Sequence, residues 1–179
     1  MIALTGTPGT GKTSVAEELK KRGYKVISVR EFAEIHRCAK KAGNEIIIDI
    51  ERLSKHRFDG IIEGHLSHLL KPEMAIVLRC NPLVLKKRLL ERGWDYEKVM
   101  ENVEAELIDL ILVEAIENCE KVFEIDTTKM TISEVADAVE KILRGEGNFE
   151  VGKIDWISEL EDRIEEVTRY GGIQKDRMG

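Results

Sequence analysis

The chain has 179 residues, a length that suits one compact α/β domain with a small appendage better than two full domains. Its formal net charge of −6 at pH 7 argues against a protein that coats nucleic acid along its whole surface, although it permits a local basic patch. Its three cysteines (Cys38, Cys80 and Cys119) fit neither a disulfide framework nor a paired zinc motif, and no apolar run approaches membrane-spanning length, so we expect a cytoplasmic protein.

The start of the chain predicts a nucleotide-binding element. The apolar segment 1–5 predicts a short strand, which leaves no room for a signal peptide ahead of it. The strand runs into Gly6-Thr7-Pro8-Gly9-Thr10-Gly11-Lys12-Thr13, which fits the phosphate-loop pattern of Gly, four residues, Gly-Lys-Ser/Thr. Residues 14–22 then have helical spacing and end at Gly23, so strand, loop and helix follow in the required order. The alternative is a Gly-rich turn that matches by chance.

We expect this loop to hold the triphosphate of a nucleotide. Its glycines permit turn conformations closed to other residues, so that successive N–H groups can point at one anion. Lys12 is expected to reach the β- and γ-phosphates, and Thr13 to offer its hydroxyl to Mg²⁺. The predicted nucleotide-binding residues are Gly6, Thr7, Pro8, Gly9, Thr10, Gly11, Lys12, Thr13 and Ser14.

The rest of the chain alternates between predicted strands and helices. In its first half the patterns predict a strand at 24–29, a helix at 30–41 that ends at Gly43-Asn44, a β-branched segment of open state at 45–50, a helical turn at 50–53 and a strand at 61–64. In its second half they predict a strand at 74–79, a helix at 82–92, a long amphipathic helix at 96–118, a strand at 122–125, and a helix capped by Ser133 that ends near Gly145. A last helix over 154–167, with Gly171-Gly172 as its stop, follows a linker at 145–148.

This alternation predicts an α/β fold, a three-layer α/β/α sandwich around a five-stranded, mostly parallel sheet. Ligands of such sheets bind outside the carboxyl ends of the strands. We divide the chain into a phosphate-loop domain over 1–144 and a linker with a helical extension over 145–179. The last helix is expected either to pack on the sandwich or to pair with another chain, which makes the protein a monomer or a homodimer.

Two residues at the end of the third predicted strand are candidates for chemistry. Glu63 stands where a phosphate-loop enzyme places the carboxylate that holds Mg²⁺ or its waters. His65 is expected to contact phosphate, orient a water or transfer a proton. The alternative for Glu63 is a solvent-exposed strand end. The alternative for His65 is an ordinary surface histidine. His36, His56 and His68 have no such setting and are expected to be surface or partly buried residues.

Arginines near the fourth strand and its helix are candidates for stabilising the transferring phosphoryl group. Arg88 and Arg92 lie at the end of that helix, with Gly93 as a hinge, and Arg79 ends the strand itself. The alternative is a solvated helix C-terminus, where cations are favoured in any case.

The remaining contacts concern the two nucleotides. For a second nucleotide, Arg30, Arg37 and Asp49 are the candidate substrate contacts, although an ordinary charged helix face would look the same. For adenine, the loop at Asp126 and Thr127 is placed to offer backbone contacts. The guanine-reading tetrapeptide Asn-Lys-x-Asp of GTPases does not occur in the sequence, so a small kinase is favoured.

The order of these motifs resembles the adenylate kinase isoenzyme 6 family over residues 2–144. The resemblance rests on the phosphate loop, on Glu63-Gly64-His65 where the family has an acidic-x-His, on Arg88-Leu89 with Arg92-Gly93-Trp94, and on the pattern from Asn102 to Glu106. It implies a nucleoside monophosphate kinase and ATPase with a monophosphate-binding segment over about 30–57 and a short lid over about 88–97. The family has a Gly-Asp pair followed by an Arg early in the monophosphate-binding helix, where this chain has Arg30-Glu31 and Glu34.

We therefore expect an ATP- and Mg²⁺-dependent kinase that phosphorylates AMP and has intrinsic ATPase activity. Lys12, Glu63, His65, Arg88 and Arg92 are its expected catalytic residues, and Thr13 and Glu63 its metal contacts. Because members of the family assist maturation of the small ribosomal subunit in eukaryotes, the resemblance also implies an alternative: an ATPase assembly factor that binds a ribosomal protein or rRNA. A third alternative is a kinase for a sugar or a shikimate-like acceptor.

Overall fold

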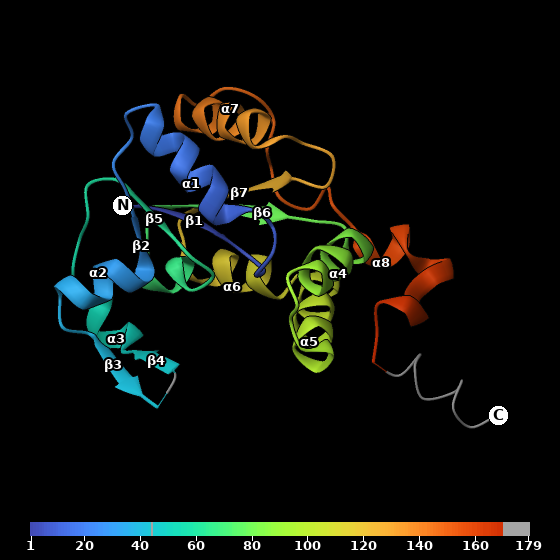
Figure 1. Ribbon diagram of the computed structural model, residues 1–179. Coiled ribbons are helices and arrows are strands. Elements are labelled where there is room, and N and C mark those ends of the chain that lie inside the picture. The colour runs from blue at the N-terminus through green and yellow to red at the C-terminus, as the bar shows by residue number, and fades with distance from the viewer. Residues whose placement is uncertain (44, 170–179) are drawn as a thin grey trace.

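A parallel sheet of five strands forms the centre of the molecule in the computed structural model, which describes residues 1–43 and 45–169 (Figure 1). The strands lie in the order β2-β5-β1-β6-β7. Their bounds are β1 (Ile2–Gly6), β2 (Val26–Ser28), β5 (Ile61–Glu63), β6 (Met74–Arg79) and β7 (Lys121–Asp126). Ile2 pairs with Ile61 on one side and with Met74 on the other, so β1 is the middle strand. The phosphate loop therefore begins at the centre of the carboxyl edge of the sheet.

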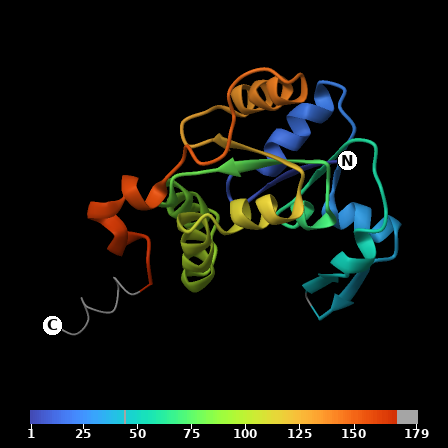
Figure 2. The same ribbon diagram turned by 180° about the vertical axis from the view of Figure 1, so that it is seen from behind.

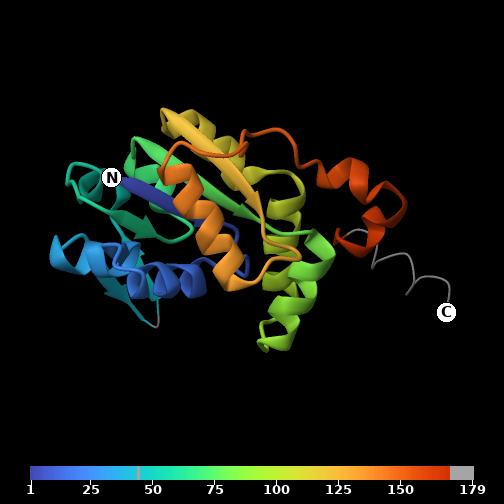
Figure 3. The same cartoon turned by 90° about the horizontal axis from the view of Figure 1, so that it is seen from above.

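Helices cover both faces of this sheet, which confirms the three-layer sandwich (Figures 1 and 3). One face carries α1 (Lys12–Lys21) and α7 (Ile132–Leu143), and the other carries α6 (Leu110–Asn118). Alternate residues of the strands point to the two faces. Leu4 and Ile76 pack in the same cluster as α1 and α7, whereas Ala3 and Ala75 pack in the cluster that includes residues of α6. Because successive side chains of a strand point to opposite faces, the continuous apolar runs of β1 and β6 supply the cores of both layers.

The prediction of a helix over 30–41 is wrong in its second half. The helix α2 (Val29–Ile35) is short, and Arg37 adopts a left-handed φ of 54°. An antiparallel hairpin of β3 (Ala39–Ala42) and β4 (Glu45–Ile48) follows, before α3 (Ile50–Leu53). The β-branched run Ile46–Ile48 favours a strand and gives residues 39–42 a partner, so pairing outweighs the helical spacing. Asn44, part of the expected helix stop, lies outside the described residues.

The long helix expected over 96–118 is two helices, α5 (Tyr96–Leu107) and α6. Between them Asp109 adopts a left-handed φ of 58°. Arg79 Nη2 donates to the backbone carbonyl of Glu106 at 3.3 Å and also bonds the Asp109 carboxylate. The same carbonyl accepts from the backbone N–H of Asp109 at 3.2 Å, a bond of the i to i+3 type that tightens the last turn of α5, and the chain turns. The helix breaks because of a partner that lies on a distant strand.

The chain after β7 differs from expectation at both of its helical elements. The N-cap of α7 is Thr131, not Ser133, and Thr131 forms a capping box with Glu134. The expected helix over 154–167 is a single turn of α8 (Trp156–Glu159) followed by the 3₁₀ turns of η2 (Glu161–Glu166). Leu160, with a φ of −108° and a ψ of 17°, separates the two, and Arg163 within η2 has a non-helical φ of −129°. The expected stop at Gly171-Gly172 lies outside the described residues.

This C-terminal segment packs on the rest of the chain, which is the first of the two expected arrangements. Trp156, Leu160 and Val167 are buried in one apolar cluster with Leu85 of α4 (Pro82–Glu91) and Val99 of α5. Figures 1 and 2 show the segment beside α4 and α5, at the end of the molecule opposite the β3–β4 hairpin. Within residues 1–43 and 45–169, no helix has the length and apolar character needed to cross a membrane.

The capping box at α7 gives a first testable prediction. Thr131 Oγ1 accepts from the backbone N–H of Glu134, and Thr131 N–H donates to Glu134 Oε2 at 2.7 Å. Thr131→Ala should lower the free energy of unfolding by about 1 kcal/mol in urea titrations, because it leaves an amide of the first turn without its acceptor. Ser133→Ala is the control and should lower the free energy of unfolding by less. The Ser133 side chain does not cap the helix, and its hydroxyl accepts an exposed hydrogen bond from Arg22 Nη2. Equal losses would contradict the assigned cap.

Candidate active site

The loop between β1 and α1 takes a conformation that only glycine permits at its first position. Gly6 has a φ of 136°, and a Cβ atom there would lie 2.3 Å from the backbone oxygen of Leu78. Gly9 and Gly11 also have positive φ, at 97° and 103°. Thr10 N and Thr10 Oγ1 both donate to the carbonyl of Thr7, at 3.2 and 2.9 Å. The loop is therefore folded back on itself, as a phosphate cradle must be.

Lys12, the first residue of α1, closes this loop. Its Nζ donates to the carbonyls of Gly6 and Thr7 at 2.7 and 2.9 Å, and only 8% of the residue is exposed. Burial lowers the pKa of Lys12 to about 8, against the opposing effect of the carboxylates of Glu63 and Glu106. The ammonium group stands at the amino end of a helix, where an anion is favoured.

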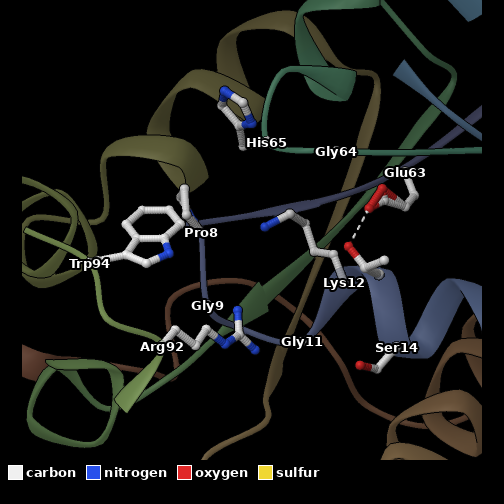
Figure 4. Close-up of a pocket in the computed structure, with 11 residues that line it drawn as sticks. Pro8, Gly9, Gly11, Lys12, Ser14, Glu63, Gly64, His65, Arg92 and Trp94 are labelled. Atoms are coloured by element: carbon white, nitrogen blue, oxygen red, sulfur yellow. Dashed lines mark hydrogen bonds between the residues drawn. The ribbon is translucent and has the colours of Figure 1, made fainter. Parts of the chain in front are cut away.

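A cavity of about 240 Å³ opens in front of the loop and brings most of the predicted catalytic residues together (Figure 4). It is lined by Pro8, Gly9, Gly11, Lys12, Thr13, Ser14, Glu63, Gly64, His65, Arg92 and Trp94. Glu63 ends β5, next to β1 in the sheet, and its Oε1 accepts a hydrogen bond from Thr13 Oγ1 at 2.9 Å. The first turn of α1 and the end of β5 thus present a hydroxyl and a carboxylate to the same space.

This pair of oxygen ligands fits Mg²⁺. Magnesium binds through one or two protein oxygens and takes the rest of its shell from water and phosphate. No group of three or more His, Cys, Asp or Glu side chains suited to a metal occurs in the part of the chain that the structure describes. Thr13 and Glu63 are compatible with a metal ion shared with a triphosphate.

His65, Arg92 and Trp94 reach the same cavity from other elements, as Figure 4 shows. His65 follows β5. Its pKa is lowered below the usual value of 6.5, chiefly because its surroundings desolvate the imidazolium and secondly because Lys12 repels the charge. It is therefore a neutral imidazole at pH 7. Arg92 is the C-cap of α4, followed by Gly93 with a φ of 74°, a backbone state that suits the expected hinge.

Arg88 lies one turn earlier on α4 and lines a separate cavity of about 160 Å³. Gly11, Ser14, Arg92 and Thr127 also line this cavity. Arg88 Nη2 donates to the carbonyls of Thr127 and Thr128 at 3.4 and 3.3 Å. The two arginines of α4 thus stand on the two sides of the phosphate loop, with Arg92 lining both cavities.

A further cavity of about 340 Å³ adjoins the first on the side of β2 and α2. It is lined by Thr13, Ser28, Val29, Arg30, Ile48, Glu63, Gly64, His65 and Leu66. Arg30 is exposed and bonds Glu34 at 3.0 Å. Of the three predicted substrate contacts, the structure brings Arg30 alone to this cavity. Arg37 and Asp49 do not line any of the three cavities, and Asp49 caps α3 through the N–H of Arg52.

Some predicted roles change in the structure. Arg79, a candidate for phosphoryl contact, is 1% exposed and bonds the carboxylates of Glu106, Asp109 and Glu124. It is a buried structural cation behind the loop. His68, expected at or near the surface, is fully buried in η1 (Ser67–Leu70), between Thr5 Oγ1 at 2.9 Å and Glu114 Oε2 at 3.1 Å.

The predicted adenine loop is partly at the cavities. Thr127 lines the one that includes Arg88, and its hydroxyl donates to the carbonyls of Thr10 and Arg79 at 3.0 and 2.9 Å. The Asp126 carboxylate instead accepts from the backbone N–H of Thr128 at 2.9 Å and does not line that cavity.

Two residues at the loop were missed. Trp94 lines the main cavity, and Glu106 accepts a hydrogen bond from Thr7 Oγ1 at 2.5 Å. The signal for Trp94 was its place directly after Arg92-Gly93 in a short lid. Glu106 ends the pattern from Asn102 that supports the family resemblance, but nothing in the sequence indicates its contact with the loop, because it lies on the apolar stripe of a helix and its partners are distant in sequence.

Several known proteins are similar to this chain over most of its length. A family model described as "AAA domain" matches residues 2–109. A protein of Archaeoglobus fulgidus named "Putative adenylate kinase" is 59% identical over 94% of this chain and 98% of its own. One of the same name from Pyrococcus abyssi is 41% identical over 96% and 99%. Among solved structures, the YorR protein of Bacillus subtilis, in complex with phosphorylated GDP, has a TM-score of 0.56 and 19% identity over 80% of this chain and 95% of its own, which supports the fold alone.

Proposed function

Because this chain belongs to the archaeal-type adenylate kinase family, and is therefore a kinase, we propose that it transfers the γ-phosphoryl group of ATP to AMP. A phosphate oxygen of AMP attacks the γ-phosphorus, the bond from that phosphorus to the β–γ bridging oxygen breaks, and two molecules of ADP result. When AMP is absent, water takes its place and ATP is hydrolysed slowly.

One observation carries this proposal: the cavity at the phosphate loop and the cavity beside β2 meet at the same four residues, Thr13, Glu63, Gly64 and His65. A donor in the first cavity and an acceptor in the second would have their phosphates within this shared wall. Phosphoryl transfer needs little covalent help, so positioning two phosphates and neutralising their charge is most of the catalysis.

Each polar residue at the phosphate-loop cavity has a proposed role that follows from its chemistry. Lys12 and the loop amides bind the β- and γ-phosphates. Thr13 and Glu63 would hold Mg²⁺, which when bound neutralises charge on the phosphates. Arg92 faces the same space and stabilises charge on the transferring group. His65, neutral at pH 7, positions the attacked group by hydrogen bonding rather than by charge.

The remaining predicted contacts belong to the ends of the two nucleotides. Arg88 and the loop at Thr127 would receive the adenosine of ATP, where their cavity continues from the phosphate loop. Arg30 would contact the phosphate of AMP.

The test follows product formation from ATP and Mg²⁺ with and without AMP. We expect two molecules of ADP for each AMP consumed, and much slower release of free phosphate without AMP. CMP, GMP and UMP are the comparison acceptors. Free phosphate released at a rate that AMP does not change would contradict the kinase assignment and favour an ATPase that drives assembly of a partner.

A pair of variants tests the acceptor cavity. Arg30→Met should raise the KM for AMP by about tenfold, as expected for one lost charge-assisted hydrogen bond, without changing ATP hydrolysis in the absence of AMP. Arg57→Met is the control, since Arg57 is exposed and lies away from the three cavities. An unchanged KM for AMP in Arg30→Met would remove this residue from the acceptor site.

The lowered pKa of Lys12 predicts how ATP binding depends on pH. The lysine is charged below its pKa of about 8, and only the charged form attracts phosphate. The Kd for Mg²⁺·ATP should therefore be nearly constant from pH 6 to 7 and rise above pH 8, by up to about tenfold per pH unit. Calorimetric titrations at each pH measure this. Lys12→Met should bind weakly with no such rise, and a native Kd equal at pH 7 and pH 9.5 would contradict the prediction.

A further inference from the structure

Glu106 is a buried carboxylate that the proposed chemistry does not use. It lies on α5 and is 2% exposed. Its Oε2 accepts the hydroxyl of Thr7 at 2.5 Å. Its Oε1 accepts from Trp156 Nε1 at 3.0 Å, from Arg79 Nε at 2.8 Å and from the backbone N–H of Cys80 at 3.1 Å. One carboxylate thus connects the phosphate loop with the C-terminal segment.

Thr7 is the point at which this carboxylate reaches the loop. Its side chain donates to Glu106, while its own carbonyl accepts from Lys12 Nζ at 2.9 Å and from Thr10 N at 3.2 Å. A hydroxyl bonded to a carboxylate makes a strong hydrogen bond. Because Thr7 is 1% exposed, water cannot replace that bond if it is lost. Glu106 therefore helps to fix the position of Thr7. Because the Thr7 carbonyl accepts from Lys12 Nζ, it also helps to fix the position of the Lys12 ammonium group.

Trp156 holds the other oxygen of Glu106 from the C-terminal segment. The indole is 2% exposed, and the guanidinium of Arg79 lies 6.0 Å from its ring centroid. The same segment is tied to the sheet by the N–H groups of Lys153 and Ile154, which donate to Glu124 Oε1 at 2.9 and 3.3 Å. Glu124 in turn accepts from Arg79 Nη1 at 3.2 Å. The segment is thus anchored in the polar cluster that supports the loop, beside α4 and α5 as Figure 3 shows.

We propose that Glu106 is a positioning residue for the phosphate loop, and that the indole N–H of Trp156 fixes its orientation, so that the C-terminal segment sets the affinity of the loop for nucleotide. This rests on the proposed function only in that the loop must bind ATP. Because such coupling is reciprocal, nucleotide bound in the loop must also change the environment of the Trp156 indole. A carboxylate that served only to neutralise Arg79 would have no such effect.

Binding measurements on single and double variants test the connection. Thr7→Val keeps the shape of the side chain but removes its donor, and should raise the Kd for Mg²⁺·ATP about tenfold, whereas Thr7→Ser should restore most of the affinity. Trp156→Phe should raise the Kd about threefold in the native chain and have no further effect in Thr7→Val, because both changes act on the same carboxylate.

Val167→Ala separates positioning from general destabilisation. Val167 is buried in the same apolar cluster as Trp156, and no side-chain hydrogen bond links it to the loop. The variant Val167→Ala should lower the Tm without changing the Kd for Mg²⁺·ATP. A Kd raised by Val167→Ala as much as by Trp156→Phe, or a Kd unchanged in both Thr7→Val and Trp156→Phe, would overturn the proposal.

Indole N–H resonances give a readout that a purely structural role would not move. The chain has two tryptophans, so protein labelled with ¹⁵N-tryptophan shows two signals, which Trp156→Phe assigns. Saturating Mg²⁺·ATP should shift the Trp156 signal in the native chain and in Thr7→Ser but not in Thr7→Val. If only Trp94, at the cavity, responds, this proposal fails and the proposed function stands. If neither signal responds and calorimetry detects no binding, the proposed function fails as well.

Discussion

Lys12→Met should lower kcat/KM for ATP by about 10³-fold or more while the protein stays folded. The ammonium group is held by the carbonyls of Gly6 and Thr7, at the amino end of α1, in the cavity that also contains Glu63 and Arg92. In this position it meets the charge that grows on the phosphates as the bond to the γ-phosphorus breaks. Methionine has a similar length and flexibility but offers neither charge nor donor.

Stability should change little, or rise, in the same variant. Because burial lowers the pKa of Lys12 from 10.5 to about 8, the folded state disfavours the charged lysine; this cost grows as the pH falls from 10.5 to 8 and is fully present at pH 7. Methionine removes the cost together with the two hydrogen bonds. Thermal unfolding at pH 7 should therefore give a Tm no more than a few degrees below that of the native protein.

The matched control is Lys20→Met on the same helix. Lys20 is an exposed lysine that bonds Glu17 at 2.9 Å and lines none of the three cavities. Its kcat/KM should equal the native value within about twofold. Steady-state assays with ATP and AMP measure both variants. Near-native turnover in Lys12→Met would rule out the catalytic scheme, and an equal loss in Lys20→Met would show that the effect is not specific.

The features predicted well from sequence are those set by neighbouring residues. The strand, the glycine loop and the helix at the start of the chain follow from a local pattern that only one backbone path satisfies. The same holds for β6, whose residues 74–78 are a continuous apolar run, and for α4, which begins at Pro82 after the Asn81 cap. Glu63 and His65, predicted as site residues from the end of a parallel strand where ligands bind, both line the main cavity.

The features that were missed depend on partners far along the chain. The left-handed backbone at Arg37 has no sequence signal, since this residue type rarely adopts it. The break between α5 and α6 is caused by Arg79, which is 27 residues before Glu106 and 30 before Asp109. From sequence, an arginine at the carboxyl end of a strand resembles a catalytic one. Only the fold reveals the acidic groups that surround it.

Arg79→Met should be the most destabilising single change, with a loss of about 3–5 kcal/mol in the free energy of unfolding. Arg79 is 1% exposed, and its guanidinium donates to Glu106 Oε1 at 2.8 Å, to Glu124 Oε2 at 3.2 Å and to Asp109. Glu106 and Glu124 are themselves buried, at 2% and 5% exposed. Without the arginine two carboxylates would remain in the interior without their main counter-charge, which costs more than the lost contacts alone.

Denaturant titrations of three variants distinguish two causes of the expected loss in stability. One is the unpaired charge of the buried carboxylates, and the other is the lost packing of the arginine side chain. Arg22→Met is the control, because Arg22 also bonds several acidic groups but near the surface, where solvent compensates, and its loss should be smaller. The double variant Arg79→Met with Glu124→Gln should be more stable than Arg79→Met alone, since it neutralises one of the two stranded carboxylates. If the second change instead adds its own loss, packing rather than charge explains the effect. If Arg79→Met costs no more than Arg22→Met, the buried cluster does not hold α5 and the C-terminal segment against the sheet.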